Sequence, residues 1–231
     1  MNILSIDFDY FQIVDKDILK DYPDGIDLPT GLSELVWSSK YAFSSDIEKV
    51  TVNQNELDTL SCIISHMDPQ APVCVSQSHK DIYSFIHSIY PDTTKSLKVI
   101  NIDMHHDYFN DNQQLDCGNW VSHLNEEYTK FAWIWVTNPI SLDVYEAKEL
   151  KPLVKQSLIE IKDLRFDALF LCRSDNWVPP HLDNFFVELI NVIQNRFTER
   201  NVDIKDRVDK PRTQWKNHKD QLREMFTKIQ K

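Results

Sequence analysis

Glycine is scarce in this chain of 231 residues, where it occurs only at Gly25, Gly31 and Gly118. The P-loop and the GxGxxG dinucleotide motif both need several closely spaced glycines, so the sequence excludes these phosphate-cradling loops. Long flexible linkers are not expected either, and the composition does not shift sharply along the chain. We therefore expect a single domain over residues 1–231, which is long enough to bury one substantial core.

Closely spaced cysteines are also missing. The four cysteines are widely scattered, with no CxxC pair and no spacing typical of a small secreted disulfide framework. Cys74 and Cys172 fall inside apolar runs, where a thiol behaves as a small hydrophobe. We expect reduced thiols in the core.

An excess of positive charge and a long apolar run are lacking as well. The formal net charge is −11, whereas a nucleic-acid partner requires concentrated Lys and Arg. A neutral or cationic substrate is easier to accommodate. No apolar run approaches the about 18 residues that span a bilayer, and MNILSIDFDY lacks the basic start of a signal peptide. We expect a cytoplasmic protein with no membrane partner.

What the chain does contain is an alternation of short apolar runs and longer amphipathic segments. This pattern predicts an α/β protein with a mainly parallel sheet and helices on both faces. The predicted strands are 2–8, 72–76, 97–103, 132–137 and 168–173, and the predicted helices are 56–67, 80–90, 141–161 and 182–197. The LPTGLSEL segment predicts a loop that leads into a short helix. A charged C-terminal helix, solvated or partner-binding, is expected at about 205–231.

Polar side chains that can bind metal follow three of the predicted strands. The first strand ends in SIDFD, the second is followed by SH, and the third runs directly into DMHHD. Ligands collect at the carboxyl ends of parallel strands, where successive βα loops meet. The six candidate metal ligands at this edge are Asp7, Asp9, His79, Asp103, His105 and Asp107.

Carboxylates and imidazoles gathered this closely need compensation. Residues two apart in an extended segment point to the same side, so Asp7 can act with Asp9, as can the ligands of DMHHD. Such groups would repel one another and be costly to desolvate, and divalent cations supply the compensation. Oxygen and imidazole donors without thiolate favour manganese, iron or zinc. Structural alternatives stay open: Asp7 and Asp9 as turn or capping residues, and His79 as a helix cap.

Three of these segments resemble the arginase and ureohydrolase superfamily. VINIDMHHDYFN looks like its DxHxD segment, SIDFDYF resembles its SxDxD strand, and PVCVSQSHKD is similar to its strand that ends in a ligand histidine. LPTGLSE is loosely similar to its GGL(S/T) loop. Here the DxD strand precedes the DxHxD strand, so the resemblance implies a circularly permuted, three-layer arginase-like fold. The family that includes the peptide arginases of ribosomal-peptide natural-product pathways has this order, and FLCRSDNWVPPHLD fits it too.

The resemblance implies two Mn²⁺ ions bridged by Asp7 and Asp103, with Fe²⁺ or Zn²⁺ less favoured. Each ion would be completed by one histidine and one carboxylate: His79 with Asp107, and His105 with Asp9. The implied reaction is hydrolysis of the guanidinium group of arginine side chains in a peptide, which gives ornithine and urea.

Further roles are implied for four residues near these ligands. Asp107 would accept a proton from the nucleophile, and His123 would relay a proton to the departing amine. His123 follows a CGN segment that looks like the superfamily's SGN, although it is equally expected on a helix that begins near Asn119. Asn119 would contact the backbone end of the substrate. Asp175 would hold the guanidinium, or serve in a turn before two prolines. His106 is expected to point away from the ligands.

Other functions stay open at this point. Zinc deacetylases share the Asp-x-His strand with an adjacent histidine, as in DMHH, but have no counterparts of Asp107 and His79. A ureohydrolase acting on a free guanidine such as arginine or agmatine would use the same chemistry. A binding protein that has lost turnover is the third alternative. The sequence is compatible with a homo-oligomer and does not define the oligomeric state.

Overall fold

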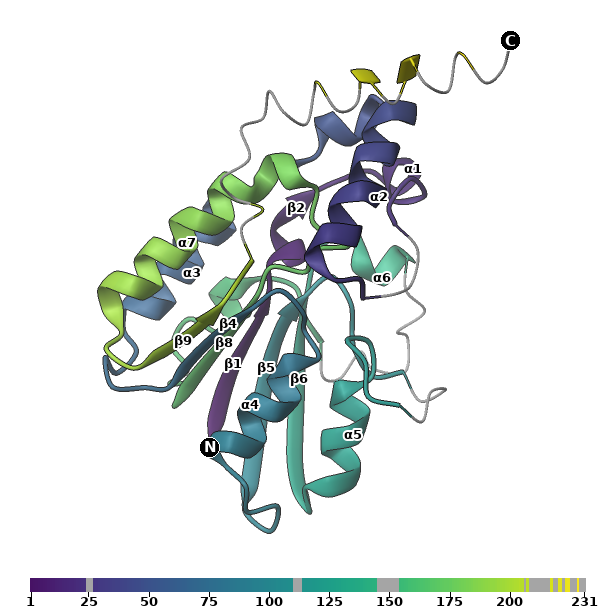
Figure 1. The fold of residues 1–231 in the computed structure, drawn as a ribbon. Coiled ribbons are helices and arrows are strands. Elements are labelled where there is room, and N and C mark those ends of the chain that lie inside the picture. Colours follow the sequence, from purple (N-terminus) through teal and green to yellow (C-terminus); the bar gives the residue numbers. More distant parts are fainter. Residues whose placement is uncertain are drawn as a thin grey trace.

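A single parallel sheet forms the centre of the molecule (Figure 1). The computed structural model describes residues 1–23, 27–109, 114–144, 154–205 and 207, and isolated residues between 217 and 228. Within these residues the sheet has seven strands in the order β7-β6-β5-β1-β8-β4-β9, and all pairs are parallel. The strands are β1 (Asn2–Asp7), β4 (Val73–Ser76), β5 (Ser96–Asp103), β6 (Lys130–Thr137), β7 (Val154–Lys155), β8 (Ala168–Cys172) and β9 (Arg200–Asp203).

Helices cover both faces of the sheet, which gives the three layers expected from the sequence. In Figure 1, α3 and α7 lie on one face, whereas α4 and α5 lie on the other. The long helices are α2 (Thr30–Phe43), α3 (Gln54–Ser65), α4 (Asp81–Ile89), α5 (Trp120–Glu127) and α7 (Asp183–Arg196). Helix α2 lies beyond the carboxyl ends of the strands. The short helices α1 (Lys16–Leu19) and α6 (Ser141–Val144) lie there as well.

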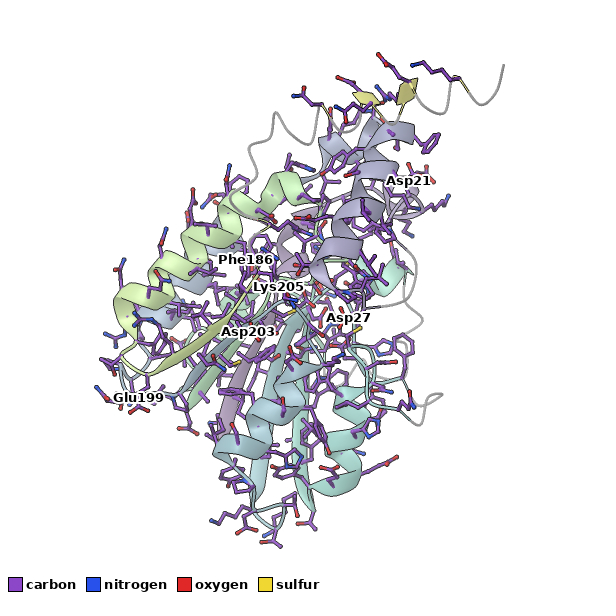
Figure 2. All side chains as sticks on the ribbon, viewed as in Figure 1. Asp21, Asp27, Phe186, Glu199, Asp203 and Lys205 are labelled. Carbon is purple, nitrogen blue, oxygen red and sulfur yellow. The ribbon has the colours of Figure 1, made fainter. Side chains whose placement is uncertain are left out.

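Each face of the sheet has its own hydrophobic core. On one face Phe8 and Phe186 meet edge to face, with ring centroids 5.3 Å apart, and Figure 2 shows Phe186 between α7 and the sheet. On the other face Trp120 of α5 and Phe170 of β8 are fully buried. Strands buried on both faces read as continuous apolar runs, which is why these segments could be recognised.

Strand β1 occupies the middle of the sheet. It pairs with β5 from Asn2↔Lys98 to Ile6↔Ile102, and with β8 up to Asp7↔Cys172. Because the pairs are parallel and in this register, the carboxyl ends of all three strands meet at one edge. The residues that follow β1, β5 and β8 are therefore neighbours although they are far apart in the sequence.

The five predicted strands and three of the predicted helices are confirmed. Helix α3 begins where the Asn53 side chain accepts a hydrogen bond from the Glu56 backbone N–H at 3.3 Å, as an N-cap should. LPTGLSEL enters a helix as expected, but α2 extends over 14 residues and is not short. The edge strand β9 was not predicted, because its residues are exposed and all but Val202 are polar.

The prediction of one helix over 141–161 is wrong. Helix α6 is followed by strand β7 and by the 3₁₀ helix Leu158–Glu160. Pro152 supplies a physical reason, since proline cannot donate the helical hydrogen bond and disfavours helical backbone in the preceding residue.

Most of the predicted C-terminal helix at 205–231 lies outside the described residues. Those described between 217 and 228 are helical, and Arg223 donates a hydrogen bond to the Ala42 carbonyl at the end of α2. A short antiparallel pair, β2 (Gln12–Ile13) and β3 (Thr51–Val52), lies outside the main sheet. No helix within the described residues is both long and apolar enough to cross a membrane.

Candidate metal centre

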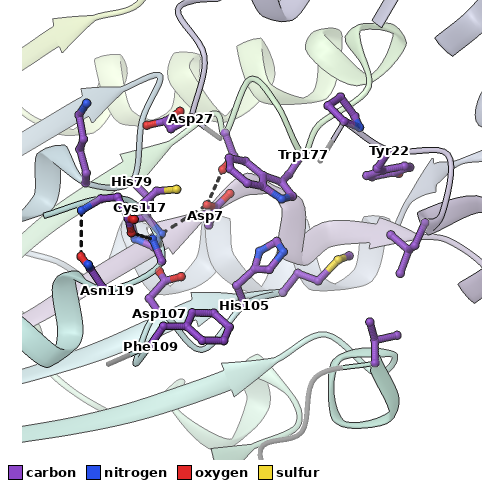
Figure 3. Close-up of a pocket in the computed structure, with 18 of the residues that line it drawn as sticks. Asp7, Tyr22, Asp27, His79, His105, Asp107, Phe109, Cys117, Asn119 and Trp177 are labelled. Atoms are coloured by element: carbon purple, nitrogen blue, oxygen red, sulfur yellow. Dashed lines mark hydrogen bonds and ion pairs between the residues drawn. The ribbon is translucent and has the colours of Figure 1, made fainter. Parts of the chain in front are cut away.

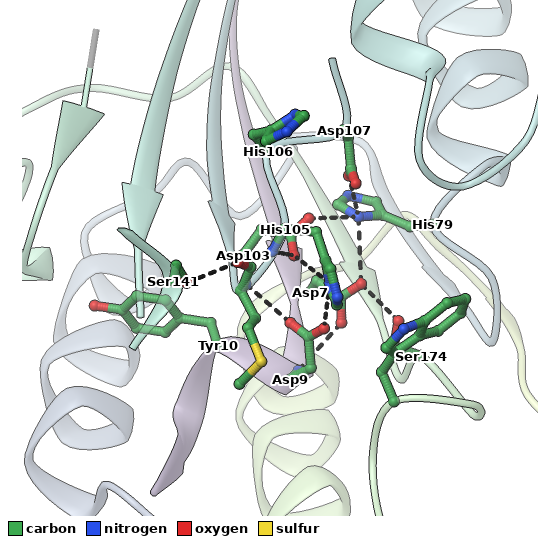
Figure 4. Close-up of polar contacts among 12 residues, drawn as sticks. Asp7, Asp9, Tyr10, His79, Asp103, His105, His106, Asp107, Ser141 and Ser174 are labelled. Carbon is green, nitrogen blue, oxygen red and sulfur yellow. Dashed lines mark hydrogen bonds and ion pairs between the residues drawn. The ribbon is translucent and has the colours of Figure 1, made fainter. Parts of the chain in front are cut away.

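All six predicted ligands lie together at the carboxyl edge of the sheet (Figure 4). Asp7 ends β1 and Asp103 ends β5, so the parallel register places the two carboxylates side by side. Asp9 lies in the 3₁₀ helix Phe8–Phe11 directly after β1. His79 follows β4, on the far side of β8. His105 and Asp107 belong to the loop that leaves β5.

Asp103 is at the centre of the cluster because its two carboxylate oxygens face different histidines. Oδ2 lies 3.0 Å from Nδ1 of His79, and Oδ1 lies 3.6 Å from Nδ1 of His105. The carboxylate is held in place by Asn101, whose Nδ2 donates to Oδ2 at 3.1 Å, and by the backbone N–H of His105. One buried carboxylate is therefore shared by two groups of ligands.

His79 forms the first group with the carboxylates around it. Its Nδ1 lies 3.0 Å from Oδ2 of Asp107 and 3.3 Å from Oδ2 of Asp7. Its Nε2 lies 2.8 Å from the hydroxyl of Ser5, and its ring stacks on Phe170. The second nitrogen of a metal-binding histidine usually makes such a contact, which fixes the direction of the ligating nitrogen.

His105 forms the second group on the other side of Asp103. Its Nδ1 lies 2.9 Å from Oδ2 of Asp9. Two sets of ligand atoms, each lying within 4.8 Å of one another, could hold a metal ion: Asp7, His79 and Asp103 in one set, and Asp9, Asp103 and His105 in the other. Oxygen and imidazole donors of this kind suit divalent transition metals.

Two buried atoms of the cluster indicate that it fits a cation. Among the described residues, Oδ2 of Asp9 and Nδ1 of His79 have no hydrogen-bond partner of good geometry, although charged groups face both. A buried polar atom without a partner is costly unless something else satisfies it. Both atoms are directed into the two ligand sets, where a bound cation would satisfy them.

The charges within the cluster strongly perturb one another. Burial and the charges of Asp7 and Asp103 raise the pKa of Asp9 well above its ordinary value. Burial and the charge of Asp103 raise the pKa of Asp107 to about 8. Burial alone would lower the pKa of His79, but the surrounding carboxylates outweigh burial and raise it. The cluster therefore holds more negative charge than its histidines neutralise, which favours divalent cations.

Residues around the cluster fix the ligands in place. The indole Nε1 of Trp120 donates to Oδ2 of Asp107 at 2.6 Å, and the backbone N–H of Met104 donates to Oδ1 of Asp9 at 3.0 Å. The hydroxyl of Ser174, after β8, donates to Oδ2 of Asp7 at 2.6 Å. Asp107 and Ser174 have φ values of 53° and 57°, in the left-handed region that non-glycine residues seldom adopt. Backbone strain of this kind clusters at functional sites.

A cavity of about 1080 Å³ opens onto one side of the cluster (Figure 3). Asp7, His79, His105 and Asp107 line it, whereas Asp9 and Asp103 are fully buried behind them. A substrate in the cavity would therefore reach both ligand sets.

The three predicted substrate or relay residues fare differently. Asn119 lines the cavity, but its amide bonds the Gln114 carbonyl and the Asp116 backbone N–H at 2.8 Å each, which shapes the loop before α5. His123 lies on α5, as the structural alternative expected, where its ring meets Tyr83 edge to face. It is not among the described cavity-lining residues.

Asp175 also lies outside the described cavity lining. Its carboxylate is buried and accepts two hydrogen bonds from Arg173, at 2.5 and 3.1 Å. Its backbone carbonyl accepts from Ser33, Trp37 and Arg207. The geometry favours the structural alternative, in which Asp175 organises the loop after β8. His106 points away from the cluster, as expected, with its ring packed on Phe109 and Trp135.

Sequence reasoning missed four residues that position the site. Ser5 could have been found, because it lies two positions before Asp7 in the same strand and so faces the same side. Ser174 follows a strand that ends at the ligand edge, one position before the predicted Asp175. Trp120 begins α5 and Trp177 lies in the loop after β8, and neither belongs to a sequence pattern that indicates contact with the ligands.

Comparisons with known proteins leave the family open. No family model matches the chain, and no curated protein or solved structure matches it. Membership of the arginase superfamily therefore stays a prediction from the sequence motifs, and the function is proposed from the geometry.

Proposed function

We propose that this protein is a dinuclear, manganese-dependent hydrolase that converts arginine side chains of a peptide to ornithine and releases urea. The observation that carries the proposal is the position of Asp103, whose two carboxylate oxygens face His79 and His105 in separate ligand sets. A single-metal site needs one such set. Two sets joined by a shared carboxylate favour two cations, and so favour an arginase-type site over a one-zinc deacetylase.

The ligand sets define what the chain itself contributes. His79 with Asp7 and Asp107 would hold one cation, His105 with Asp9 would hold the other, and Asp103 would serve both. Bound divalent cations lower the pKa of water towards neutrality and so supply hydroxide at physiological pH. Asp107 lines the cavity and is held by Trp120, so its carboxylate is placed to accept a proton on the substrate side.

The reaction itself consumes one water molecule. The water oxygen bonds to the guanidinium carbon, the bond from that carbon to the side-chain nitrogen breaks, and the oxygen becomes the carbonyl oxygen of urea. Water loses both of its protons in this process, and the departing nitrogen gains both to become the ornithine ammonium group. Asp107 is placed to receive the first of these protons and pass it on. This scheme needs no contribution from His123, which lies against Tyr83.

The cavity supports a cationic substrate. Asp27 and Asp116 line it in addition to the ligands, and Phe109 lies beside Asp107 and adds an aromatic ring that can attract a planar cation such as guanidinium. Its volume of about 1080 Å³ is large for a free amino acid and leaves room for the residues beside an arginine.

Metal analysis combined with peptide mass spectrometry tests the proposal. The protein loaded with Mn²⁺ is incubated with an arginine-containing peptide and with free arginine or agmatine. We expect two metal ions per chain, urea in solution, and the mass loss that conversion of arginine to ornithine produces, on the peptide. One zinc ion per chain with cleavage of acetyl-lysine would overturn the proposal, whereas turnover of free arginine alone would correct only the substrate.

A further inference from the structure

The cavity has two chemically different halves, with the ligand cluster between them. Figure 3 shows Cys117 and Asn119 on one side of His105 and Tyr22 on the other, with Trp177 next to His105. The first half also contains Asp27, Lys80 and Asp116 and is the more polar of the two, although Phe109 also lines it. The second half, called the apolar half here, lies near α1 and α6, which the Lys16–Asp143 ion pair joins. Its apolar lining residues are Leu19, Tyr22, Met104, Val144 and Trp177, and Lys16, Lys20 and Asp143 lie at its rim.

The apolar half begins directly at the metal ligands. Met104 lies between Asp103 and His105 in the sequence, and its buried side chain lines the cavity. The ring of Trp177 meets the ring of His105 edge to face, with centroids 5.7 Å apart. The apolar surface therefore lies directly beside any group bound at the cluster.

Hydrogen bonds of Gln12 hold the side chain of Tyr22 and the backbone of Trp177, the two aromatic residues of the apolar half. The buried amide of Gln12 donates to the Trp177 carbonyl at 2.8 Å and accepts from the Tyr22 hydroxyl at 2.6 Å. Because the hydroxyl of Tyr22 is used in this way, its ring presents carbon atoms to the cavity. Walls fixed in this way bind a ligand without first having to become ordered.

Two exposed ion pairs lie at the rim of the apolar half. Nζ of Lys16 lies 3.3 Å from Oδ2 of Asp143, which joins α1 to α6, and Lys20 is paired with Asp17 at 2.6 Å. These charges already have partners. The ammonium and carboxylate of a free amino acid would therefore find mostly apolar side chains in this half, where the rim charges of Lys16 and Lys20 are already paired, and their desolvation would be costly.

We infer that the apolar half binds a large aliphatic or aromatic side chain next to the arginine in a peptide substrate. This inference rests on the proposed function and specifies its substrate class: arginine beside leucine, phenylalanine or a residue of similar size. Tyr22, Val144 and Trp177 would determine this preference. Burying such a side chain contributes about 1.5–3 kcal/mol, which corresponds to roughly ten- to a hundredfold in affinity.

Binding of matched peptides tests the inference independently of turnover. Three fluorescein-labelled peptides differ only in the residues on both sides of one central arginine, which are leucine, glycine or aspartate. Their Kd values are measured by fluorescence anisotropy, with and without Mn²⁺. We expect the leucine peptide to bind at least about tenfold more tightly than the glycine peptide, and the aspartate peptide to bind most weakly.

Two valine variants of matched exposure identify the surface responsible. Val144 lines the apolar half and is 38 % exposed, whereas Val202 in β9 is 39 % exposed and does not line the described cavity. We expect Val144→Asp to bring the leucine-to-glycine affinity ratio close to one and Val202→Asp to preserve it. Equal binding of all three peptides, or a preference that survives Val144→Asp, overturns the inference.

The outcomes also separate this inference from the proposed function. If the leucine peptide binds more tightly and Val144→Asp removes the preference, the apolar half is a peptide-binding surface even where no peptide loses mass. In that case only the proposed chemistry fails. If every peptide is converted at the same rate and binds with the same Kd, the chemistry stands and the apolar half has no part in specificity.

Discussion

The hydroxyl of Ser174 donates a 2.6 Å hydrogen bond to Oδ2 of Asp7, across 167 positions of sequence. The same carboxylate oxygen lies 3.3 Å from Nδ1 of His79. Ser174 makes this contact from a left-handed backbone conformation, with φ of 57°. The loop after β8 is therefore held in an unfavourable geometry by the position that its hydroxyl must occupy.

Two substitutions of Ser174 separate the hydroxyl from the backbone. Ser174→Gly and Ser174→Ala both remove a buried hydrogen bond to a charged group, worth about 1.5–3 kcal/mol. An alanine at this position keeps the left-handed backbone strain, which costs about 1 kcal/mol, whereas glycine relieves it. We expect both variants to bind Mn²⁺ more weakly, and Ser174→Ala to have the lower free energy of unfolding in urea titrations. Unchanged Mn²⁺ affinity in both would show that the hydroxyl does not orient Asp7.

Adding metal should stabilise the protein against heat. A ligand that binds only the folded state at a hundred times its Kd contributes about 2.7 kcal/mol, so Mn²⁺ should raise the Tm and EDTA should reverse the rise. Asp103→Asn should abolish this rise, because Asp103 belongs to both ligand sets. Asp92→Asn, at an exposed turn, is the matched control and should respond like the unsubstituted protein. Differential scanning calorimetry measures each Tm, and a full rise in Asp103→Asn contradicts the shared-ligand assignment.

His123→Ala should change the rate of arginine conversion little. A histidine that relays protons in the transition state contributes about 10²- to 10⁴-fold, so the expected result is easily distinguished from a relay role. The physical reason is position, since the ring meets Tyr83 on α5 and does not line the described cavity. His105→Ala is the comparison, and it should lose both Mn²⁺ and activity. A large fall in kcat for His123→Ala, with Mn²⁺ binding retained, would show that His123 does act as a proton relay.

The loop after β8 should make stability depend on pH in the acid range. Burial alone would raise the pKa of Asp175, but the positive charges of Arg207 and Arg173 outweigh burial and lower it. A carboxyl with a lower pKa in the folded state stabilises above its unfolded pKa of about 3.9, and this stabilisation is lost as the pH falls through the folded value. We expect the free energy of unfolding to fall more steeply below about pH 4 in the unsubstituted protein than in Asp175→Asn.

Two arginines outside this loop provide the comparison. Arg207 is buried, and its guanidinium bonds both carboxylate oxygens of Asp183 at 2.8 and 3.0 Å. Arg207→Ala leaves Asp183 buried without its partner and should cost about 3–5 kcal/mol near neutral pH. Arg165→Ala, on the surface, should cost far less. If the free energy of unfolding depends on pH in the same way in the unsubstituted protein and in Asp175→Asn, the carboxylate of Asp175 has no electrostatic role in stability.

The sequence predicted the parts of this fold that are regular. Strands β1, β5 and β8 are continuous apolar runs, and the ligands follow them directly, so the rule that ligands gather at carboxyl ends located the cluster. Strand β9 escaped prediction because a polar edge strand has no hydrophobic pattern. Helix 141–161 was wrong because the apolar spacing was weighted above Pro152.

Roles that depend on loop geometry could not be predicted. Asp175 and Ser174 are adjacent, and the pattern does not show which of them faces the cluster, because Ser174 itself has a left-handed backbone that changes the direction of the chain. His123 is on α5, and the direction of its side chain depends on how that helix packs against α4. In both cases closeness to the ligands in the sequence did not show whether the side chain faces the cluster, because the local direction of the backbone determines this.

Strand β1 comes first along the chain but lies in the middle of the sheet. Its neighbour β8 begins at Ala168, and the Asn2 backbone N–H bonds the Asp167 carboxylate across 165 positions. During synthesis β1 must therefore wait until residue 172 has been made before both of its edges are paired, and such distant pairing is slow. Asp7 gains its hydrogen bond from Ser174 only after that strand is complete. Because β8 also lies between β1 and β4, which precede Asp9 and His79, we expect a chain that lacks β8 not to bring these candidate ligands together.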